Sequence, residues 1–236
     1  MDNPRITQLQ TALQLGDYEI TGQFTFGSNY TFLVTVSYEG REYPAVYKPT
    51  RGEQPLWDFP ENTLAGREVT AYLVSEHLGF HIVPFTVLRD DGPYGAGSLQ
   101  HHIEYDPEYH YFSFTDKDRQ LLKPVALFDL LCNNADRKGS HVFFEEDTHK
   151  LYAIDHGICF HEDNKLRTVL WDFAGQKIPE DLLAPLTRIK SLLPSLEPYL
   201  TSRELSALCN RAESILKKGV FPRQPHDRRA MPWPPL

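Results

Sequence analysis

The chain has 236 residues, of which 41% are hydrophobic and 24% are charged, and its formal net charge is −8. This length and composition are typical of a globular protein that builds one large domain or two small lobes. The negative charge argues against non-specific binding to nucleic acid or to an anionic membrane, because both need clustered Lys and Arg.

The first half of the chain has the pattern of an antiparallel sheet with helices. Apolar and polar residues alternate over its strands, with turn signals at residues 27–29 and 39–40, and a helical pattern ends at Gly79. We expect a short helix at residues 7–15, a three-stranded meander at 18–50 and a helix at 64–78. Two more strands are expected at 82–90 and 98–105.

The second half is mainly helical in pattern. After an acidic, aromatic connector, three helices are expected at residues 118–132, 179–193 and 202–218. The tail "FPRQPHDRRAMPWPPL" carries five prolines in sixteen residues, and we expect it to be disordered or draped over the surface. The fold class is therefore α+β in two lobes. We expect an antiparallel-sheet lobe at residues 1–105, a connector at 106–118, a short helical lobe at 119–220 and a Pro-rich tail at 221–236.

Two features of the first lobe are suited to binding a nucleotide. The turn Gly27-Ser28-Asn29 has small residues whose backbone N–H groups could cradle an anion, although an ordinary hairpin turn has the same composition. Lys48 stands on an apolar strand, and Glu68 follows about twenty residues later on a helix. Such a pair can hold phosphates through the lysine while the glutamate holds the lysine.

Two carboxylates in the second lobe are candidates for catalysis and metal binding. Asp136 follows a helix and begins a turn, and Asp155 ends the apolar strand "LYAI" before His156-Gly157. One can accept a proton from an attacking hydroxyl, and the other can bind a magnesium ion that bridges phosphates. Turn capping is the alternative role for either side chain.

The order of these residues resembles the kinase-like superfamily, and specifically its atypical branch of phosphatidylinositol 3-/4-kinase-like proteins. "NNADRKGSH" is similar to the catalytic loop of that branch, and "AIDHG" is similar to its metal-binding Asp-x-Gly. From about residue 20 to 220, the pattern, including "KPTRGEQPLWDFP", "VPFTV", "GSLQ" and "KLRTVLWDFAG", resembles a bacterial family of the same branch, seen largely in actinobacteria.

The resemblance implies a bilobal kinase-like fold, an ATP-dependent phosphotransferase with an unidentified acceptor, and the cofactors ATP and Mg²⁺ or Mn²⁺. It implies that Lys48 contacts the phosphates of ATP, that Glu68 holds Lys48, and that Gln100 at the hinge contacts adenine. It also implies that Asp136 is the catalytic aspartate, that Arg137 supports its loop and that Asp155 binds the metal. His141 stands where the family pattern has asparagine, so either its imidazole is the second metal contact or the site uses one metal ion held by Asp155. No Ala-Pro-Glu segment follows, so peptide substrates are not implied.

Other interpretations remain open. A nucleotide-binding pseudokinase that acts as a sensor is favoured by His141, and a metal-dependent phosphohydrolase could use His101, His102, His141, His156 and His161. Lys165 and Arg167 could bind a substrate anion or simply coat a surface loop, and Trp57 is expected to anchor the core. With no signal peptide and no apolar run near the about 20 residues that a membrane helix needs, we expect a cytoplasmic protein without membrane insertion or a nucleic-acid partner.

Overall fold

The computed structural model of the chain describes residues 4–24 and 30–236. Its N-terminal part is a five-stranded sheet in the order β1-β2-β3-β5-β4, in which every neighbouring pair is antiparallel. The elements of this part are α1 (Pro4–Leu15), β1 (Asp17–Phe24), β2 (Thr31–Tyr38), β3 (Arg41–Pro49), η1 (Thr50–Gly52), α2 (Leu64–Leu78), β4 (Thr86–Gly92) and β5 (Gly95–His101).

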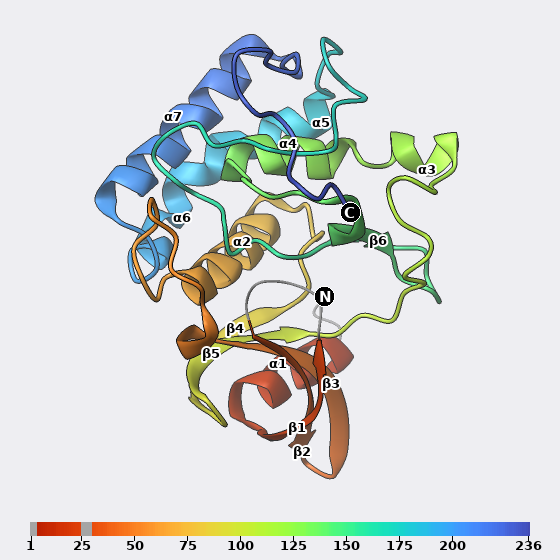
Figure 1. Cartoon of the computed structure of the whole chain (residues 1–236), viewed down its shortest axis with the longest axis vertical. Coiled ribbons are helices and arrows are strands. Elements are labelled where there is room, and N and C mark those ends of the chain that lie inside the picture. Colours follow the sequence, from red (N-terminus) through yellow and green to blue (C-terminus); the bar gives the residue numbers. More distant parts are fainter. Residues whose placement is uncertain (1–3, 25–29) are drawn as a thin grey trace.

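The C-terminal part is helical apart from one short hairpin. Its elements are α3 (Asp116–Gln120), α4 (Lys123–Cys132), η2 (Gly139–His141), β6 (Val142–Phe144), β7 (Leu151–Ala153), α5 (Glu180–Leu183), η3 (Ala184–Arg188), α6 (Ile189–Leu196) and α7 (Ser202–Lys218). Figure 1 shows the sheet at one end of the molecule, the helices α4, α6 and α7 at the other, and α2 between them.

Two apolar cores explain why the chain divides in this way. Alternate residues of β2 point inward and pack with α1, so that Leu13, Val34 and Tyr47 lie in one small core. The larger core joins α2 to the C-terminal helices through Ala71, Val74 and their neighbours. Because α2 lies between β3 and β4 of the sheet in sequence and packs against the helical part, it fixes the two parts against each other.

The antiparallel five-stranded sheet confirms the α+β fold class, but several predicted boundaries were wrong. The predicted helix over 118–132 is interrupted at Leu121 and Leu122, where α3 ends and α4 begins with Pro124 in its first turn. The predicted helix over 179–193 is a succession of α5, η3 and α6 that ends at Leu196. β4 begins at Thr86 rather than at residue 82, because Pro84 cannot donate to a sheet ladder.

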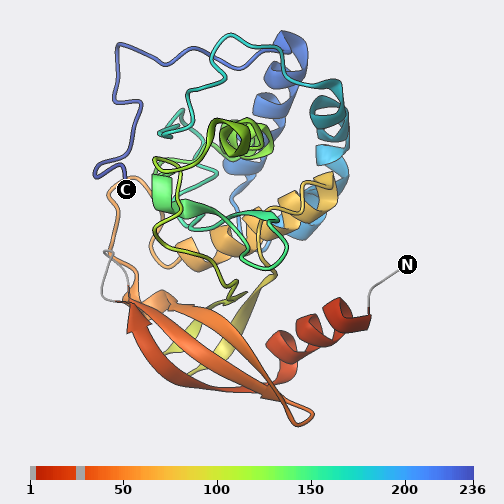
Figure 2. The same cartoon turned by 90° about the vertical axis from the view of Figure 1, so that its right-hand side faces the viewer.

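The Pro-rich tail is ordered and lies over the C-terminal part, so that of the two expectations, disorder or draping over the surface, the second is confirmed. Phe221 and Ala230 are buried, the Ala230 carbonyl accepts a hydrogen bond from Thr168 N (3.0 Å), and the Pro235 carbonyl accepts one from Gly139 N (2.8 Å). Figure 2 shows the tail running over the outside of the helical part and ending near η2. Over the described residues, no helix is both long and apolar enough to cross a membrane.

Candidate active site

A pocket with a volume of about 290 Å³ lies between the sheet and the C-terminal part, and residues of both parts line it. Six of the predicted site residues line this pocket: Lys48, Glu68, Gln100, Asp136, His141 and Asp155. The predicted phosphate turn, Gly27-Ser28-Asn29, lies outside the described residues. The structure therefore brings together polar side chains from β3, α2, β5, the loop of residues 133–141 that is predicted to be the catalytic loop, and the end of β7.

Lys48 is held by two carboxylates. It lies on β3 opposite Ser98 of β5, and its Nζ is 2.5 Å from Glu68 Oε1 and 2.9 Å from Asp155 Oδ1. Burial disfavours the ammonium, but Asp155 and Glu68 outweigh it and raise the pKa of Lys48 above its ordinary value. Lys48 is therefore a fixed positive charge inside the pocket.

Glu68 links the two parts of the molecule. Its side chain, only 3% exposed, lies on the buried face of α2. One carboxylate oxygen accepts from Lys48, and the other, Oε2, accepts from the backbone N–H of His156 at 2.9 Å. A change in the position of α2 would therefore move both the lysine and the segment that carries Asp155.

Asp155 follows β7 with a left-handed backbone, at φ 62°. Aspartate tolerates this conformation better than most residues, and such backbone angles persist where the surroundings fix them. Its side chain is 47% exposed, and it faces the pocket. Although burial opposes ionisation, the Lys48 ammonium holds the pKa of Asp155 well below its ordinary range, so the group is a carboxylate at neutral pH.

His141 lies against the second oxygen of this carboxylate. Its Nε2 is 3.3 Å from Asp155 Oδ2, and its Nδ1 is 3.5 Å from the backbone N of Lys138. Burial lowers the pKa of His141 to about 4, although Asp155 opposes the shift, so the ring is neutral at neutral pH. If Nδ1 accepts from Lys138, Nε2 carries the proton and donates to Asp155.

Asp136 stands at the edge of the same pocket. The loop that carries it starts at Asn133, a left-handed residue that ends α4, and Asn134 Oδ1 accepts a hydrogen bond from Asp136 N at 2.9 Å. Burial raises the pKa of Asp136 from 3.8 to about 6, even though Lys138, with Nζ 3.7 Å away, opposes this. A carboxylate with a pKa near 6 is suited to accept a proton at neutral pH.

Arg137 does not line the pocket, unlike the other predicted catalytic residue. It is fully buried and bonds both oxygens of Asp129, with Nε 3.0 and 3.1 Å away. Its NH1 donates to the carbonyls of His141 (3.2 Å) and Ile154 (2.6 Å), and its NH2 lies 2.7 Å from His156 Nε2. Arg137 therefore fastens the loop of residues 133–141 to the segment that carries Asp155, and the loop-support role that the resemblance implies stays a prediction.

Sequence reasoning missed Asp129, the buried partner of Arg137. It lies in α4 and also accepts from Asn134 Nδ2 (3.1 Å) and Thr168 Oγ1 (3.1 Å). The available signal was one acidic residue within the apolar run "VALFDLLC". A charge at the centre of such a run is buried, and a buried charge needs partners.

Part of the pocket lining is apolar. Val46, Ile103, Phe143 and Ile154 form this part, and Tyr105 stacks on Phe143 with ring centroids 4.0 Å apart. Gln100, predicted to contact adenine, is buried and donates from Nε2 to Thr86 Oγ1 at 2.8 Å. Its side chain is thus engaged within the sheet, and the adenine contact stays a prediction.

The five histidines of the hydrolase interpretation do not all converge: His101, His102 and His141 line the pocket, whereas His156 and His161 do not. His156 is bonded to Arg137, and His161 Nε2 lies 2.7 Å from the Asp58 carbonyl. Across residues 4–24 and 30–236, no group of three or more His, Cys, Asp or Glu side chains could hold a metal ion. Asp155 offers carboxylate oxygens, and His141 would offer Nε2 as a second ligand only in the tautomer in which Nε2 carries no proton; a divalent cation here would take its other ligands from bound phosphates and water.

Comparisons with known proteins show both sequence and structural relatives. No family model matches the chain. Protein Rv2133c of Mycobacterium tuberculosis (strain ATCC 25618 / H37Rv) is 37% identical, over 93% of this chain and 92% of that protein. The crystal structure of the Helicobacter pylori proinflammatory kinase CtkA is similar with a TM-score of 0.55 and 13% identity, over 88% of this chain and 94% of that one. HipA of Shewanella oneidensis MR-1, in complex with HipB and operator DNA, is more distant, with a TM-score of 0.44 and 12% identity, over 85% of this chain and 65% of that one.

The similarity to CtkA extends over nearly the whole of both chains. At this identity it establishes a shared fold, and it confirms the kinase-like architecture expected from the sequence. The lobe boundaries stay a prediction.

Proposed function

Because the chain belongs to the family of the mycobacterial protein Rv2133c and has a kinase-like fold, we propose that it is an ATP-dependent phosphotransferase of the phosphatidylinositol 3-/4-kinase-like branch. The proposal rests above all on one observation, the chain of contacts Glu68–Lys48–Asp155 across the pocket. A partly buried cation beside an acidic side chain that faces the pocket is suited to hold phosphates and their metal ion together.

In this proposal, the nucleotide lies along the pocket. Adenine lies against the apolar part of the lining, between Val46 and Ile154, and Lys48 donates to the phosphates while Glu68 keeps it in place. Asp155, with His141 beside it, holds Mg²⁺ or Mn²⁺, which neutralises charge on the phosphates. Gln100 and the turn Gly27-Ser28-Asn29 are proposed to flank the nucleotide.

Asp136 acts on the acceptor. Its carboxylate accepts the proton of the acceptor hydroxyl, whose oxygen forms a bond to the γ-phosphorus as the bond to the β,γ-bridging oxygen of ATP breaks. The pKa of about 6 leaves Asp136 ionised at neutral pH while keeping it a stronger base than an exposed aspartate. Arg137 does not touch the reactants and is a positioning residue, because its contacts set the loop that carries Asp136.

The decisive test compares nucleotide binding with metal binding. Calorimetry with a non-hydrolysable ATP analogue should show that Mg²⁺ increases the affinity of the wild-type protein and that Asp155→Asn abolishes this increase while unfolding remains cooperative. Asp163→Asn is the matched control, because that carboxylate is 75% exposed and lies 4.0 Å from its only described ion-pair partner, His161. Metal-dependent affinity that survives in Asp155→Asn would remove Asp155 from the site.

A nucleotide-binding sensor without transfer activity is the second candidate. It is favoured by His141, whose Nε2 lies 3.3 Å from the second carboxylate oxygen of Asp155. An oxygen ligand at this position would bind a hard cation such as Mg²⁺ better than an imidazole nitrogen does. Thermal stabilisation by ATP together with no ADP release, in metabolite extracts and in defined acceptor panels, would support the sensor. ADP release that depends on Asp136 would support the enzyme.

A further inference from the structure

Arg167 lies beside the catalytic loop on a backbone that is fixed from both sides. Its N–H donates to the Asn134 carbonyl at 2.8 Å, and its own carbonyl accepts from Arg137 N at 3.0 Å. On the other side, the tail holds the neighbouring residues, with Arg228 NH1 on the Leu166 carbonyl at 2.9 Å. Position 167 is therefore a rigid platform next to Asp136, unlike a mobile surface loop.

The guanidinium of Arg167 is a cation without a committed acidic partner. Its side chain is half-buried, and with the described residues it makes no hydrogen bond and no ion pair. Its charge nevertheless reaches Asp136, whose pKa it lowers against the effect of burial. Half-burying an arginine without a partner is unfavourable, so such a group is suited to a ligand anion.

The other cations nearby are already engaged. Lys165 Nζ lies 2.9 Å from Asp58 Oδ2 and sits over the Trp57 ring, 5.0 Å from its centroid. Trp57 itself is 91% exposed, which corrects its prediction as a core anchor. Lys138 Nζ is 3.7 Å from Asp136. Of these three side chains, Arg167 alone is left to bind an incoming anion.

We propose that Arg167 binds an anionic group of the acceptor, so that the acceptor is an alcohol that also carries a phosphate or a carboxylate. This inference rests on the proposed function. The planar guanidinium matches either oxyanion with two parallel hydrogen bonds. Transfer then leaves that anion unchanged, gives ADP and adds a phosphate at the hydroxyl whose proton Asp136 accepts.

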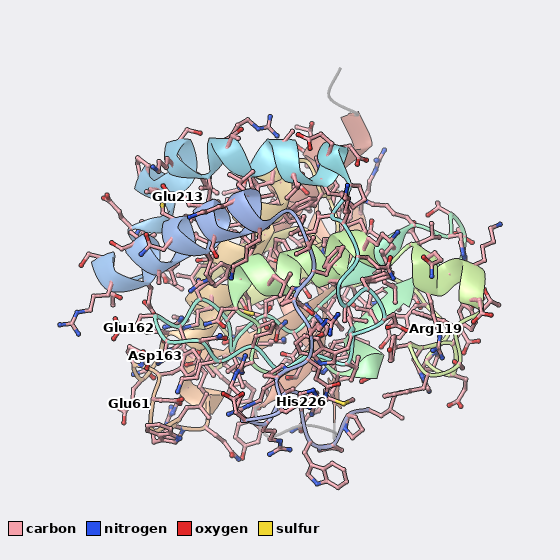
Figure 3. The ribbon with its side chains drawn as sticks, turned by 90° about the horizontal axis from the view of Figure 1, so that it is seen from above. Glu61, Arg119, Glu162, Asp163, Glu213 and His226 are labelled. Atoms are coloured by element: carbon pink, nitrogen blue, oxygen red, sulfur yellow. The ribbon has the colours of Figure 1, made fainter. Side chains whose placement is uncertain are left out.

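The acceptor is a small soluble molecule rather than the headgroup of an anionic membrane. Figure 3 shows Glu61, Glu162 and Asp163 gathered at one edge of the molecule, and the latter two lie in the segment that leads to Arg167. The whole chain has a net charge of −8, so an anionic lipid surface would repel the protein, and this acidic edge in particular. A single small anion carries too little charge to be excluded in the same way.

The test measures phosphate binding directly, so it does not need the acceptor. Inorganic phosphate is titrated, by calorimetry, into protein saturated with Mg²⁺ and a non-hydrolysable ATP analogue. We expect wild-type protein to bind phosphate and Arg167→Gln to bind it roughly ten- to a hundredfold more weakly, as for the loss of a charge-assisted hydrogen-bonded pair. Lys165→Gln, the matched control, should bind phosphate as the wild type does, because Lys165 already has Asp58.

Three results would overturn the proposal: no phosphate binding by wild-type protein, equal affinity in Arg167→Gln, or an equal loss in Lys165→Gln. The analogue titration is a separate readout. If the analogue does not bind, the proposed function fails, while phosphate titrated alone still decides for or against Arg167. In a second arm, the protein should not co-sediment with vesicles of phosphatidylcholine and phosphatidylserine, and Arg167-dependent co-sedimentation would contradict the soluble source.

Discussion

The ammonium of Lys48 lies 2.5 Å from Glu68, and the same carboxylate bonds the backbone of His156. One buried side chain thus fixes a cation of the sheet and the segment that carries the metal-binding candidate Asp155. Because the interaction joins β3 and α2 to the end of β7, the nucleotide site and the packing of the two parts depend on each other.

A double-mutant cycle tests this pair. Lys48→Met leaves the buried Glu68 carboxylate without its cation, so we expect a loss of about 3 kcal/mol in the free energy of unfolding. Lys48→Met combined with Glu68→Gln should lose less than the sum of the single changes, by about 0.5–3 kcal/mol, and each variant should weaken ATP-analogue binding.

The exposed pair Lys190–Glu213, 2.8 Å apart with side chains 67% and 59% exposed, provides the control cycle. Its coupling should be much weaker than that of the buried pair, because water screens exposed charges. Strict additivity at Lys48 and Glu68 in urea unfolding would mean that their contact does not contribute to stability.

The pKa of Asp136 predicts the acid limb of turnover. A proton acceptor must be ionised, so the rate of ADP release at saturating ATP should fall below a pH of about 6. Lys138 lowers this pKa, so Lys138→Met should shift the midpoint to higher pH, whereas Lys165→Met should not. An acid limb that stays in place in Lys138→Met would argue against Asp136 as the titrating group.

The same carboxylate should reduce the stability of the fold. The folded protein keeps a proton on Asp136 up to a pH of about 6, whereas the unfolded chain loses it near 3.8, so this group's contribution to stability decreases as pH rises between these values. Asp136→Asn removes that decrease, and we expect about 1–2 kcal/mol of added stability at pH 7 after allowance for solvent screening. Thermal unfolding at pH 4 and pH 7 measures the difference, which should nearly vanish at pH 4.

His141 gives a prediction about metal binding and pH. Burial places the pKa of His141 at about 4, so the ring takes up no proton between pH 5.5 and 8. The increase in ATP-analogue affinity that the metal causes should therefore not change with pH over this range through titration of His141. Sequence analysis alone would place the loss near the ordinary histidine value of about 6.5. His141→Asn replaces a nitrogen donor by an oxygen donor, so it should favour Mg²⁺ over Mn²⁺ relative to wild type.

His81→Asn, which changes an exposed histidine bonded to Glu76, is the control for this comparison. A wild-type loss of affinity centred near pH 6.5 that disappears in His141→Asn would contradict the lowered pKa. An unchanged Mn²⁺/Mg²⁺ preference would mean that His141 orients Asp155 without touching the metal.

The sheet and much of the site were predictable from the sequence, because both follow from local patterns. Alternation along β2 and β3 gives the strands, and Lys48 and Glu68 fall on elements whose order along the chain already suggests that they meet. What the sequence could not provide depends on distant contacts. The Pro-rich tail is held by backbone hydrogen bonds to Gly139, Thr168 and Gln176, which lie far from it in sequence. The burial of Asp129 likewise depends on Arg137, which reaches it from the loop that follows α4.

The buried pair Arg137–Asp129 leads to the last prediction. Both side chains are fully buried, so Arg137→Met leaves an uncompensated carboxylate and should cost about 3–5 kcal/mol in the free energy of unfolding. Adding Asp129→Asn should restore part of this loss. Arg203→Met, at a side chain that is 83% exposed, should change stability by less than about 0.5 kcal/mol.

Arg137→Lys separates positioning from stability. A lysine keeps the charge beside Asp129 but cannot bond Asp129, His156 and the carbonyls of His141 and Ile154 together. The variant should therefore fold and bind the ATP analogue with an affinity close to wild type, while the rate of ADP release at saturating ATP falls. A loss of analogue affinity as large as the loss of rate would show that Arg137 supports the whole pocket rather than the loop that carries Asp136.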